Sequence, residues 1–178
     1  MAAILLDPAQ SETLGLEDGG IVRMRLIRPD DEPRLVDLYE HLSQHTVYQR
    51  FFTLMPRLPA DWARALANVD YTARFAVVIE REGRAGVELI GVARYEPTGE
   101  PGLVEVAFVV RDEFQGKGYG RRLLDALLAA AEAKGITRFR AWVLADNRRM
   151  LRLLNEHTRV VSRSLDSGVA ELVFERRA

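Results

Sequence analysis

The sequence predicts a single α/β domain whose central sheet is mixed and mostly antiparallel. Its segments follow the order strand, helices, three-stranded meander, helix, strand, helix and closing hairpin, which combines antiparallel pairs with at least one crossover. Apolar residues make up 48% of the 178 residues and charged residues 29%, so the chain can bury a core and keep a polar surface. We expect residues 21–178 to form this domain and residues 1–20 to be an N-terminal lead-in segment.

The first part of the predicted domain is one strand followed by helices. Apolar and arginine residues alternate over Ile21–Ile27, as they do in a half-buried strand. Asp30 is a good N-cap for a helix over 32–43, and two further helices are expected over 47–54 and 60–68.

The middle of the chain predicts a three-stranded meander. Strands over 75–80 and 88–95 flank a turn at 82–86 that contains glycine. Residues 103–110 are nearly all apolar, which predicts a central strand that is buried on both faces.

The last part alternates helix and strand before it closes with a hairpin. A stripe of leucines makes 118–134 the clearest helix of the chain. A strand over 139–144 and a helix over 147–157 follow, and residues 160–165 and 169–174 are expected to pair as the hairpin.

The composition excludes several classes of protein. A net charge of −1 and a pI of about 6.3 argue against a dedicated nucleic-acid binder. The absence of cysteine excludes disulfides, thiolate metal ligands and a cysteine nucleophile. No stretch approaches the roughly 20 apolar residues needed to span a membrane, and the first residues do not read as a signal peptide. We therefore expect a cytoplasmic protein without nucleic-acid or membrane partners.

A glycine-rich loop, Gln115–Gly120, lies between the predicted central strand and the clearest helix. Glycine lets the backbone approach a ligand, and the amides at a helix start are available to phosphate oxygens. Lys117 and Arg121 add positive charge. The loop lacks the Gly-Lys-Ser/Thr end of a P-loop and the third glycine of a dinucleotide fingerprint. It predicts a phosphate site, and the alternative is a turn that only connects strand to helix.

The spacing of Gln115, Gly118 and Gly120 resembles the pyrophosphate signature of the GNAT superfamily of N-acetyltransferases. The resemblance covers about residues 25–154 and implies acetyl-CoA as cosubstrate. It also implies a sheet that is splayed between the strands near 103–110 and 139–144, with the pantetheine arm of CoA in the gap.

The resemblance also implies residue roles. The backbone of the residues before the loop would pair with pantetheine, and the loop would hold the pyrophosphate. These residues are Val109, Val110 and Arg111 for the arm, and Gln115, Gly116, Lys117, Gly118, Gly120 and Arg121 for the pyrophosphate. Asn147 matches an asparagine that contacts the cofactor arm, and its alternative role is a helix cap beside Asp146.

Glu105 is the candidate general base, because it is a carboxylate within the apolar strand. Burial there would favour its protonated form and suit proton transfer near neutral pH. A lysine amine has a reference pKa near 10.4, so roughly one in 2,500 is neutral at pH 7 and able to attack a thioester. Glu105 also matches the catalytic glutamate of GNAT proteins that acetylate protein lysines. The alternative is a structural pairing with Arg94 or Arg23.

The resemblance leaves the acid and the acceptor open. The position where many GNAT proteins carry a tyrosine acid holds Leu154, so no acid is named. Residues 27–52 resemble the entry region of bacterial Pat-type protein lysine acetyltransferases, which implies a protein lysine as acceptor. Within them, Tyr48 or Arg50 could line an acceptor cleft. The alternatives are a small-molecule amine as acceptor, or a non-catalytic acyl-CoA sensor.

Two further features carry weaker expectations. Asp37, His41 and His45 repeat every four residues, which could hold zinc, but the polar face of an amphipathic helix is favoured and no metal site is expected. The closing hairpin could pair across a homodimer.

Overall fold

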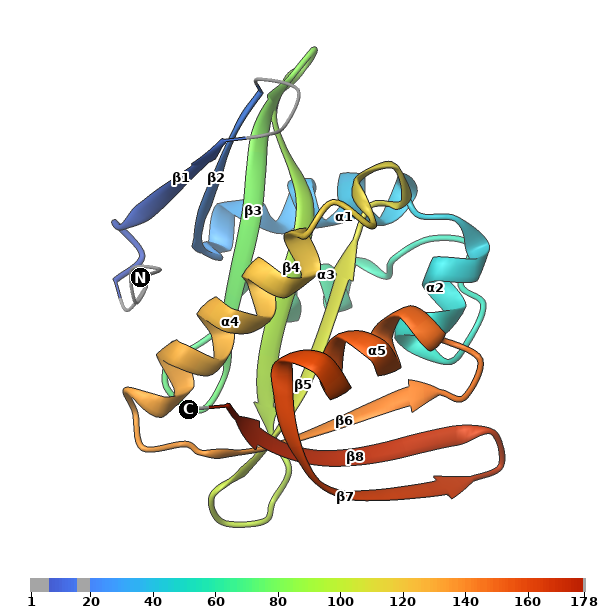
Figure 1. Cartoon of the computed structure of the whole chain (residues 1–178). Helices are drawn as coiled ribbons and strands as arrows, with labels where there is room; N and C mark the ends of the chain where they lie inside the picture. Colours follow the sequence, from blue (N-terminus) through green and yellow to red (C-terminus); the bar gives the residue numbers. More distant parts are fainter. Residues whose placement is uncertain (1–6, 16–19, 178) are drawn as a thin grey trace.

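An open sheet of eight strands forms the centre of the molecule (Figure 1). The computed structural model describes residues 7–15 and 20–177. The strands are β1 (Ser11–Gly15), β2 (Ile21–Leu26), β3 (Phe75–Gly83), β4 (Gly86–Pro97), β5 (Leu103–Val110), β6 (Arg138–Leu144), β7 (Thr158–Asp166) and β8 (Val169–Arg176). They lie in the order β1-β2-β3-β4-β5-β6-β8-β7, and among these neighbours β5 and β6 are parallel while the others are antiparallel. The predicted mixed, mostly antiparallel sheet is confirmed.

Helices cover both faces of this sheet (Figure 1). They are α1 (Glu32–Glu40), α2 (Gln44–Phe51), α3 (Ala60–Ala67), α4 (Tyr119–Glu132) and α5 (Arg148–His157), with short 3-10 turns η1 (Pro29–Asp31) and η2 (Asp112–Phe114). One core cluster joins α4 and α5 to the sheet, and a second joins α1 and α3 to the opposite face. Alternation along β3 produces the two clusters, because Phe75 and Val77 enter the first while Ala76 and Val78 enter the second.

Local capping explains where the first two helices differ from their predicted bounds. The first predicted helix extends to residue 43, but α1 ends at Glu40. Ser43 instead caps α2, since its side chain accepts a hydrogen bond from the Thr46 amide. The second helix therefore begins at Gln44, three residues before its predicted start at Val47.

The lead-in segment predicted for residues 1–20 contains a strand that the sequence analysis missed. Ser11–Gly15 forms β1 and pairs antiparallel with β2. Leu14 is buried in the larger core cluster, and the Arg28 side chain donates to the Pro8 carbonyl. Residues 11–15 contain Leu14 as their one large apolar side chain, so this stretch carries little strand signal. Residues 1–6 and 16–19 lie outside the described residues.

The sheet opens between β5 and β6, as predicted. These strands share three residue pairs, Leu103 with Arg138, Val104 with Phe139 and Glu105 with Arg140. Both strands continue beyond these pairs, β5 to Val110 and β6 to Leu144. The strands therefore diverge after Glu105, and the gap between them lies beside α2 and α5 (Figure 1).

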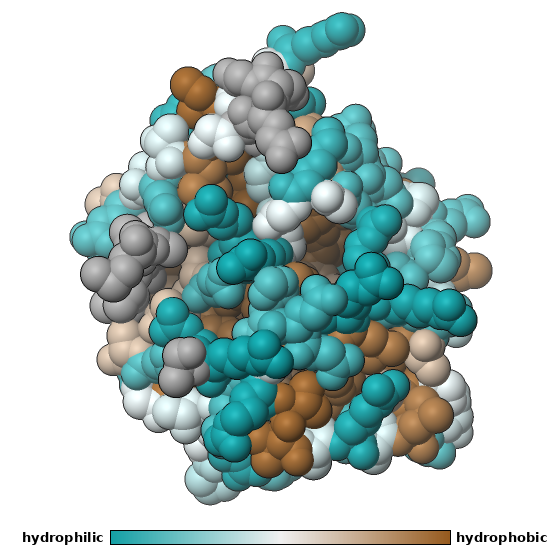
Figure 2. Space-filling view, viewed as in Figure 1, coloured by the Kyte–Doolittle hydropathy of each residue, from teal (hydrophilic) through white to brown (hydrophobic). Residues whose placement is uncertain are grey.

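The surface beside α4 and α5 is largely hydrophilic, and apolar side chains gather in its lower part (Figure 2). The edge strand β7 exposes Val161 and Leu165. Pairing of the β7–β8 hairpin across a homodimer stays a prediction. Within residues 7–15 and 20–177, no helix is both long enough and apolar enough to cross a membrane.

Candidate cofactor and acceptor site

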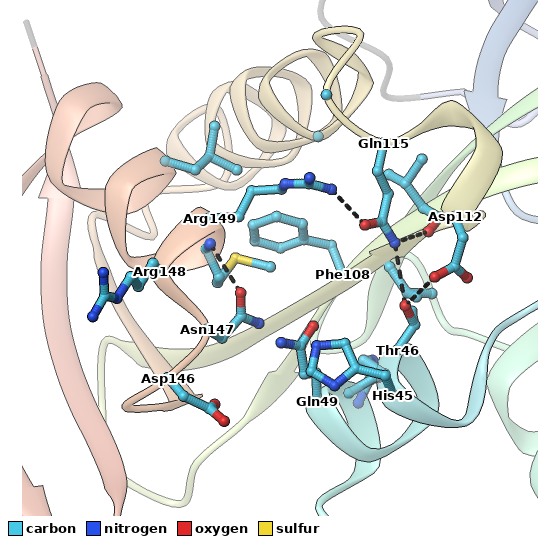
Figure 3. A pocket seen from close by; sticks show the side chains of 17 residues that line it. His45, Thr46, Gln49, Phe108, Asp112, Gln115, Asp146, Asn147, Arg148 and Arg149 are labelled. Carbon is cyan, nitrogen blue, oxygen red and sulfur yellow. Dashed lines mark hydrogen bonds between the residues drawn. The ribbon is translucent and has the colours of Figure 1, made fainter.

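A cavity of about 370 Å³ occupies the gap between the diverging strands. The end of β5, the loop after it, the start of α5 and one side of α2 line this cavity, which we call the gap cavity (Figure 3). Segments that are far apart in the sequence therefore meet at one place. Phe108 lies at its centre, between residues of the loop and of α5.

The gap cavity brings together six of the ten residues predicted to bind a cofactor. Those that line it are Val109, Val110, Gln115, Gly116, Gly120 and Asn147, and those that do not are Arg111, Lys117, Gly118 and Arg121. The Arg111 side chain is buried and pairs with Asp37 and Glu88. It thus ties β5 to α1 and β4. Lys117 and Arg121 are exposed beside the loop.

The backbone of β5 presents alternate residues to the gap. The Arg111 amide donates to the Ile90 carbonyl of β4 at 2.9 Å, and the register pairs Val92 with Val109. In an antiparallel ladder every second residue bonds to the same neighbour, so Val109 also bonds to β4. Phe108 and Val110 then point their amides and carbonyls at the gap. Of the three residues predicted to pair with pantetheine, Val110 is the one whose backbone faces this way.

Two glycines shape the loop between β5 and α4. Gly116 and Gly118 have φ angles of 76° and 87°, in the left-handed region that side chains other than glycine rarely adopt. Gly118 is the N-cap of α4. The first intrahelical hydrogen bond runs from the Arg122 amide to the Gly118 carbonyl, so the amides of Gly120 and Arg121 precede the helical ladder. The loop therefore has the geometry of an anion site.

The side chain of Gln115 bridges the two walls of the gap cavity (Figure 3). Its amide nitrogen donates to the Val110 carbonyl at 2.9 Å and to the Thr46 hydroxyl at 3.3 Å. Its amide oxygen accepts a hydrogen bond of 2.6 Å from Arg149 on α5. Gln115 thus connects β5, α2 and α5.

Asp112 fixes the start of α2 against the end of β5. Its carboxylate accepts hydrogen bonds from the Ser43 amide, the Ser43 hydroxyl and the Thr46 hydroxyl, at 3.0, 2.7 and 2.7 Å. Burial would raise the pKa of Asp112, but these hydrogen bonds outweigh burial and lower it. Since Thr46 also contacts Gln115, Asp112 positions both walls of the cavity.

A second, smaller cavity of about 50 Å³ adjoins the first. We call it the side cavity. It contains Glu105 and Trp142, and it shares Arg50, Phe108 and Asn147 with the gap cavity. The two cavities therefore meet where β5 and β6 diverge.

The predicted burial of Glu105 is wrong. Its side chain is exposed in the side cavity, at the last residue pair before β5 and β6 diverge. Its position still places a carboxylate beside the gap. The two arginines considered as its structural partners are engaged elsewhere, Arg94 with Glu96 and Arg23 with Glu82. The role of Glu105 as general base stays a prediction.

Arg50 lines both cavities, as the sequence analysis allowed. The guanidinium lies 4.7 Å from the centre of the Phe51 ring, and within the described part of the chain it makes no hydrogen bond or ion pair. Burial lowers the pKa of Arg50 to about 10, and repulsion from Arg94 acts in the same direction, against attraction to Glu105 and Glu96. Tyr48, the other candidate, is exposed and lines neither cavity.

Asn147 and Leu154 have clear structural roles on α5. Asn147 is the N-cap, since its side-chain oxygen accepts from the Met150 amide at 3.1 Å, and it also lines both cavities. The capping role is therefore confirmed, while contact with the cofactor stays a prediction. Leu154 is fully buried in the core and lines neither cavity.

Asp37, His41 and His45, whose spacing could suit a zinc site, make other contacts in the structure. Asp37 pairs with Arg111, and His41 lies in ion-pair range of Asp37 on the exposed side of α1. His45 belongs to α2 and lines the gap cavity. Residues 7–15 and 20–177 contain no group of three or more acidic or histidine side chains placed to hold a metal ion.

Sequence reasoning missed several residues that shape the site. Arg149, Thr46 and Asp112 act through contacts between segments that are distant in the chain, so no local pattern identifies them. Ser43 carried a signal, because serine is among the preferred N-cap residues of helices. Phe108 was noted only as part of the apolar strand.

The chain belongs to the GNAT family of acetyltransferases. The family profile, described as the acetyltransferase (GNAT) family, matches residues 35–157, which is more than half of the chain. Proteins of this family take the acetyl group from acetyl-CoA, and the gap cavity and the loop fit that cosubstrate.

Relatives with known names agree with this family. Over 133 residues the chain is 35% identical to acetyltransferase Pat of Mycolicibacterium smegmatis, covering 74% of this chain and 39% of that protein. It is 38% identical over 110 residues to an L-methionine sulfoximine/L-methionine sulfone acetyltransferase of Pseudomonas aeruginosa, covering 60% and 61%. The chain thus spans about two fifths and three fifths of these relatives.

A solved structure shows the same architecture. The crystal structure of the GNAT domain of S. lividans PAT superposes with a TM-score of 0.81 at 34% identity, covering 93% of this chain and 96% of that one. The eight-stranded open sheet is therefore that of a GNAT domain.

Proposed function

We propose that this chain transfers an acetyl group from acetyl-CoA to a primary amine, with a protein lysine as the first-ranked acceptor. The observation that carries the proposal is the gap cavity, which runs from the diverging strands to the glycine loop at the start of α4. Its walls offer main-chain donors at one end, and the adjoining side cavity contains the carboxylate of Glu105. A long thioester with a diphosphate fits this arrangement.

The donor binds along β5. Phe108 and Val110 turn their backbone groups to the gap and can bond to the pantetheine amides as an added strand would. The amides at the loop and at the start of α4, including Gly116, Gly118, Gly120 and Arg121, donate hydrogen bonds to the diphosphate oxygens. Lys117 adds positive charge from the exposed side of the loop.

Transfer is direct, because the chain has no cysteine to carry the acetyl group. The amine nitrogen attacks the thioester carbonyl carbon, a C–N bond forms, and the C–S bond breaks. Glu105 accepts the amine proton, directly or through a water molecule. A thiol with a reference pKa near 8.5 leaves readily as thiolate, which fits Leu154 at the position of the usual acid. The amide of Phe108 or Val110 can stabilise the carbonyl oxygen.

The test is amine-dependent release of the free thiol of CoA by the wild-type chain and by Glu105→Gln. We expect the variant to bind CoA normally and to lose about 10²- to 10⁴-fold in turnover at neutral pH, the range of a general base. Glu156→Gln is the matched control, since Glu156 is exposed on α5 and lines neither cavity. Full turnover by Glu105→Gln at neutral pH would refute the assignment.

A small-molecule amine is the second candidate acceptor. It is favoured by the 38% identity to the L-methionine sulfoximine/L-methionine sulfone acetyltransferase. Parallel assays with lysine peptides and with amino acids separate these acceptors. An acyl-CoA sensor without catalysis would bind acetyl-CoA and release no thiol with either.

A further inference from the structure

Arg50 is a cation that faces the site and forms no ion pair with the residues that the structure describes. Its side chain is half-buried at the end of α2, and its guanidinium makes no hydrogen bond or ion pair with the described residues. The burial that lowers its pKa also makes its positive charge costly unless an anion lies beside it. A carboxylate that binds beside such an arginine stabilises its charge. The planar guanidinium group can donate two parallel hydrogen bonds to the two carboxylate oxygens.

Arg50 lies where the two cavities meet, and it lines both of them. It shares the side cavity with Glu105 and Trp142, where β5 and β6 diverge. Gly116 and Gly120, which belong to the proposed diphosphate loop, line the gap cavity and not the side cavity. Arg50 therefore adjoins the Glu105 end of the site, which the two loop glycines do not line.

Arg50 and Glu105 together form a pair of opposite charges around one cavity. They attract each other, yet no ion pair joins them, so each retains room for a ligand group. Nearby Arg94 is engaged by Glu96 and by the Leu66 carbonyl, and is not free to take an anion. An acceptor with an ammonium group and a carboxylate a few bonds apart would match this pair.

We propose that Arg50 determines acceptor specificity by binding a carboxylate that the acceptor carries close to the amine to be acetylated. The proposal rests on the proposed transfer to an amine. The carboxylate can belong to an acidic residue next to a target lysine, or it can be the α-carboxylate of a free amino acid. Both sources present the same chemistry to Arg50, and the Glu105 side receives the amine.

The test compares matched acceptors that differ in one carboxylate. One pair consists of identical peptides with lysine followed by glutamate or by glutamine. The other pair is an amino acid and its carboxamide, compared at equal concentrations of neutral amine. We expect kcat/KM to favour the acidic member by about tenfold or more, the size of a hydrogen bond to a charged group. The pair that shows the preference identifies the source of the carboxylate.

Three variants assign the preference to Arg50. In Arg50→Gln the ratio of kcat/KM for the acidic acceptor to kcat/KM for the neutral acceptor should fall towards one. Arg50→Lys should retain part of the preference, because lysine keeps the positive charge but cannot make the bidentate contact of a guanidinium group. Arg57→Gln is the control, since Arg57 is exposed after α2 and lines neither cavity. Its ratio should equal that of the wild type. An equal loss on acidic and neutral acceptors in Arg50→Gln would instead indicate a role in folding or in the chemical step, and would overturn the proposal.

A binding measurement keeps this result distinct from failure of the proposed function. The CoA-loaded protein is titrated with the acetylated form of each peptide and of each small acceptor. Tighter binding of the acidic member, lost in Arg50→Gln, supports the proposal even if turnover is absent. Equal affinities within both pairs would overturn it, even if thiol release proves that the enzyme is active.

Discussion

At the residue scale, a buried ionic cluster anchors the start of the helical segment to the sheet. The Arg25 side chain on β2 is almost fully buried and bonds to Asp31 at 2.7 and 2.8 Å and to Glu80 at 2.8 Å. Burial would raise the pKa of Asp31, but bonds from Arg25 and from the Arg28 amide outweigh it and lower the pKa. Each buried charge in the cluster has a partner of opposite charge. Removal of any one of them would leave another charge buried without compensation and would destabilise the fold.

Asp31→Asn should therefore destabilise the protein strongly. Removal of one partner leaves Arg25 buried without full compensation, at a cost of about 3–5 kcal/mol in the free energy of unfolding. Because the folded pKa is lowered, the contribution of Asp31 is complete above its ordinary value of 3.8 and is lost as the pH falls through the lower, folded value. Urea titrations at pH 7 and at acidic pH measure this. A difference between wild type and variant that does not shrink in acid would contradict the account.

Glu105 and Arg50 show how much of a site residue's surroundings can be predicted from the sequence. Both were identified from their residue type and neighbours. The exposure of Glu105 could not be predicted, because it depends on where β6 leaves β5, and that point follows from packing over the whole sheet. Nor does a sequence show that Arg50 contacts the Phe51 ring and forms no ion pair within the described part of the chain.

At the element scale, strands were easier to predict than helix ends. The apolar run 103–110 coincides with β5, because a central strand that is buried on both faces consists mainly of apolar residues. The boundary between α1 and α2 was misplaced, since the cap at Ser43 is reinforced by Asp112, 69 residues away. Contacts of that range decide local structure without leaving a local pattern.

Asp112→Asn tests this long-range contact. The amide group of asparagine turns a donor towards the Ser43 and Thr46 donors, so we expect a loss of about 1–3 kcal/mol in stability. The affinity for CoA should fall as well, because Thr46 no longer holds Gln115. Thermal denaturation and calorimetric titration with CoA measure the two effects. Glu113→Gln, an exposed neighbour, should change neither, and an unaltered CoA affinity in Asp112→Asn would disprove the coupling.

At the scale of the whole molecule, the core and the site occupy different parts of the sheet. Both cavities are lined by residues between His45 and Leu153, whereas β1 covers the distant edge of β2. The order of elements from β2 to β8 followed from periodicity together with turn and capping residues. The edge strand β1 could not be predicted in this way, because a mostly polar strand forms through its pairing with the neighbouring strand and has no apolar pattern of its own.

Deletion of residues 1–20 should separate stability from ligand binding. The loss of β1 uncovers β2 and removes the buried Leu14, so we expect the melting temperature to fall by about 4–8 °C, equivalent to roughly 2 kcal/mol for a chain of this size. The affinity for acetyl-CoA should stay unchanged. Differential scanning calorimetry with and without acetyl-CoA tests both statements. An unchanged melting temperature would mean that β1 contributes nothing, and a lost affinity would mean that the edge strand supports the site.

The divergence of β5 from β6 has a consequence for how such a domain can evolve. A donor that bonds to the backbone of Phe108 and Val110 makes few demands on side-chain identity, so substitutions along this strand leave its recognition in place. In the proposed function, acceptor choice instead depends on side chains such as Arg50, which belongs to α2 and not to β5. New substrates can therefore be acquired by point mutation without the loss of an inherited cosubstrate.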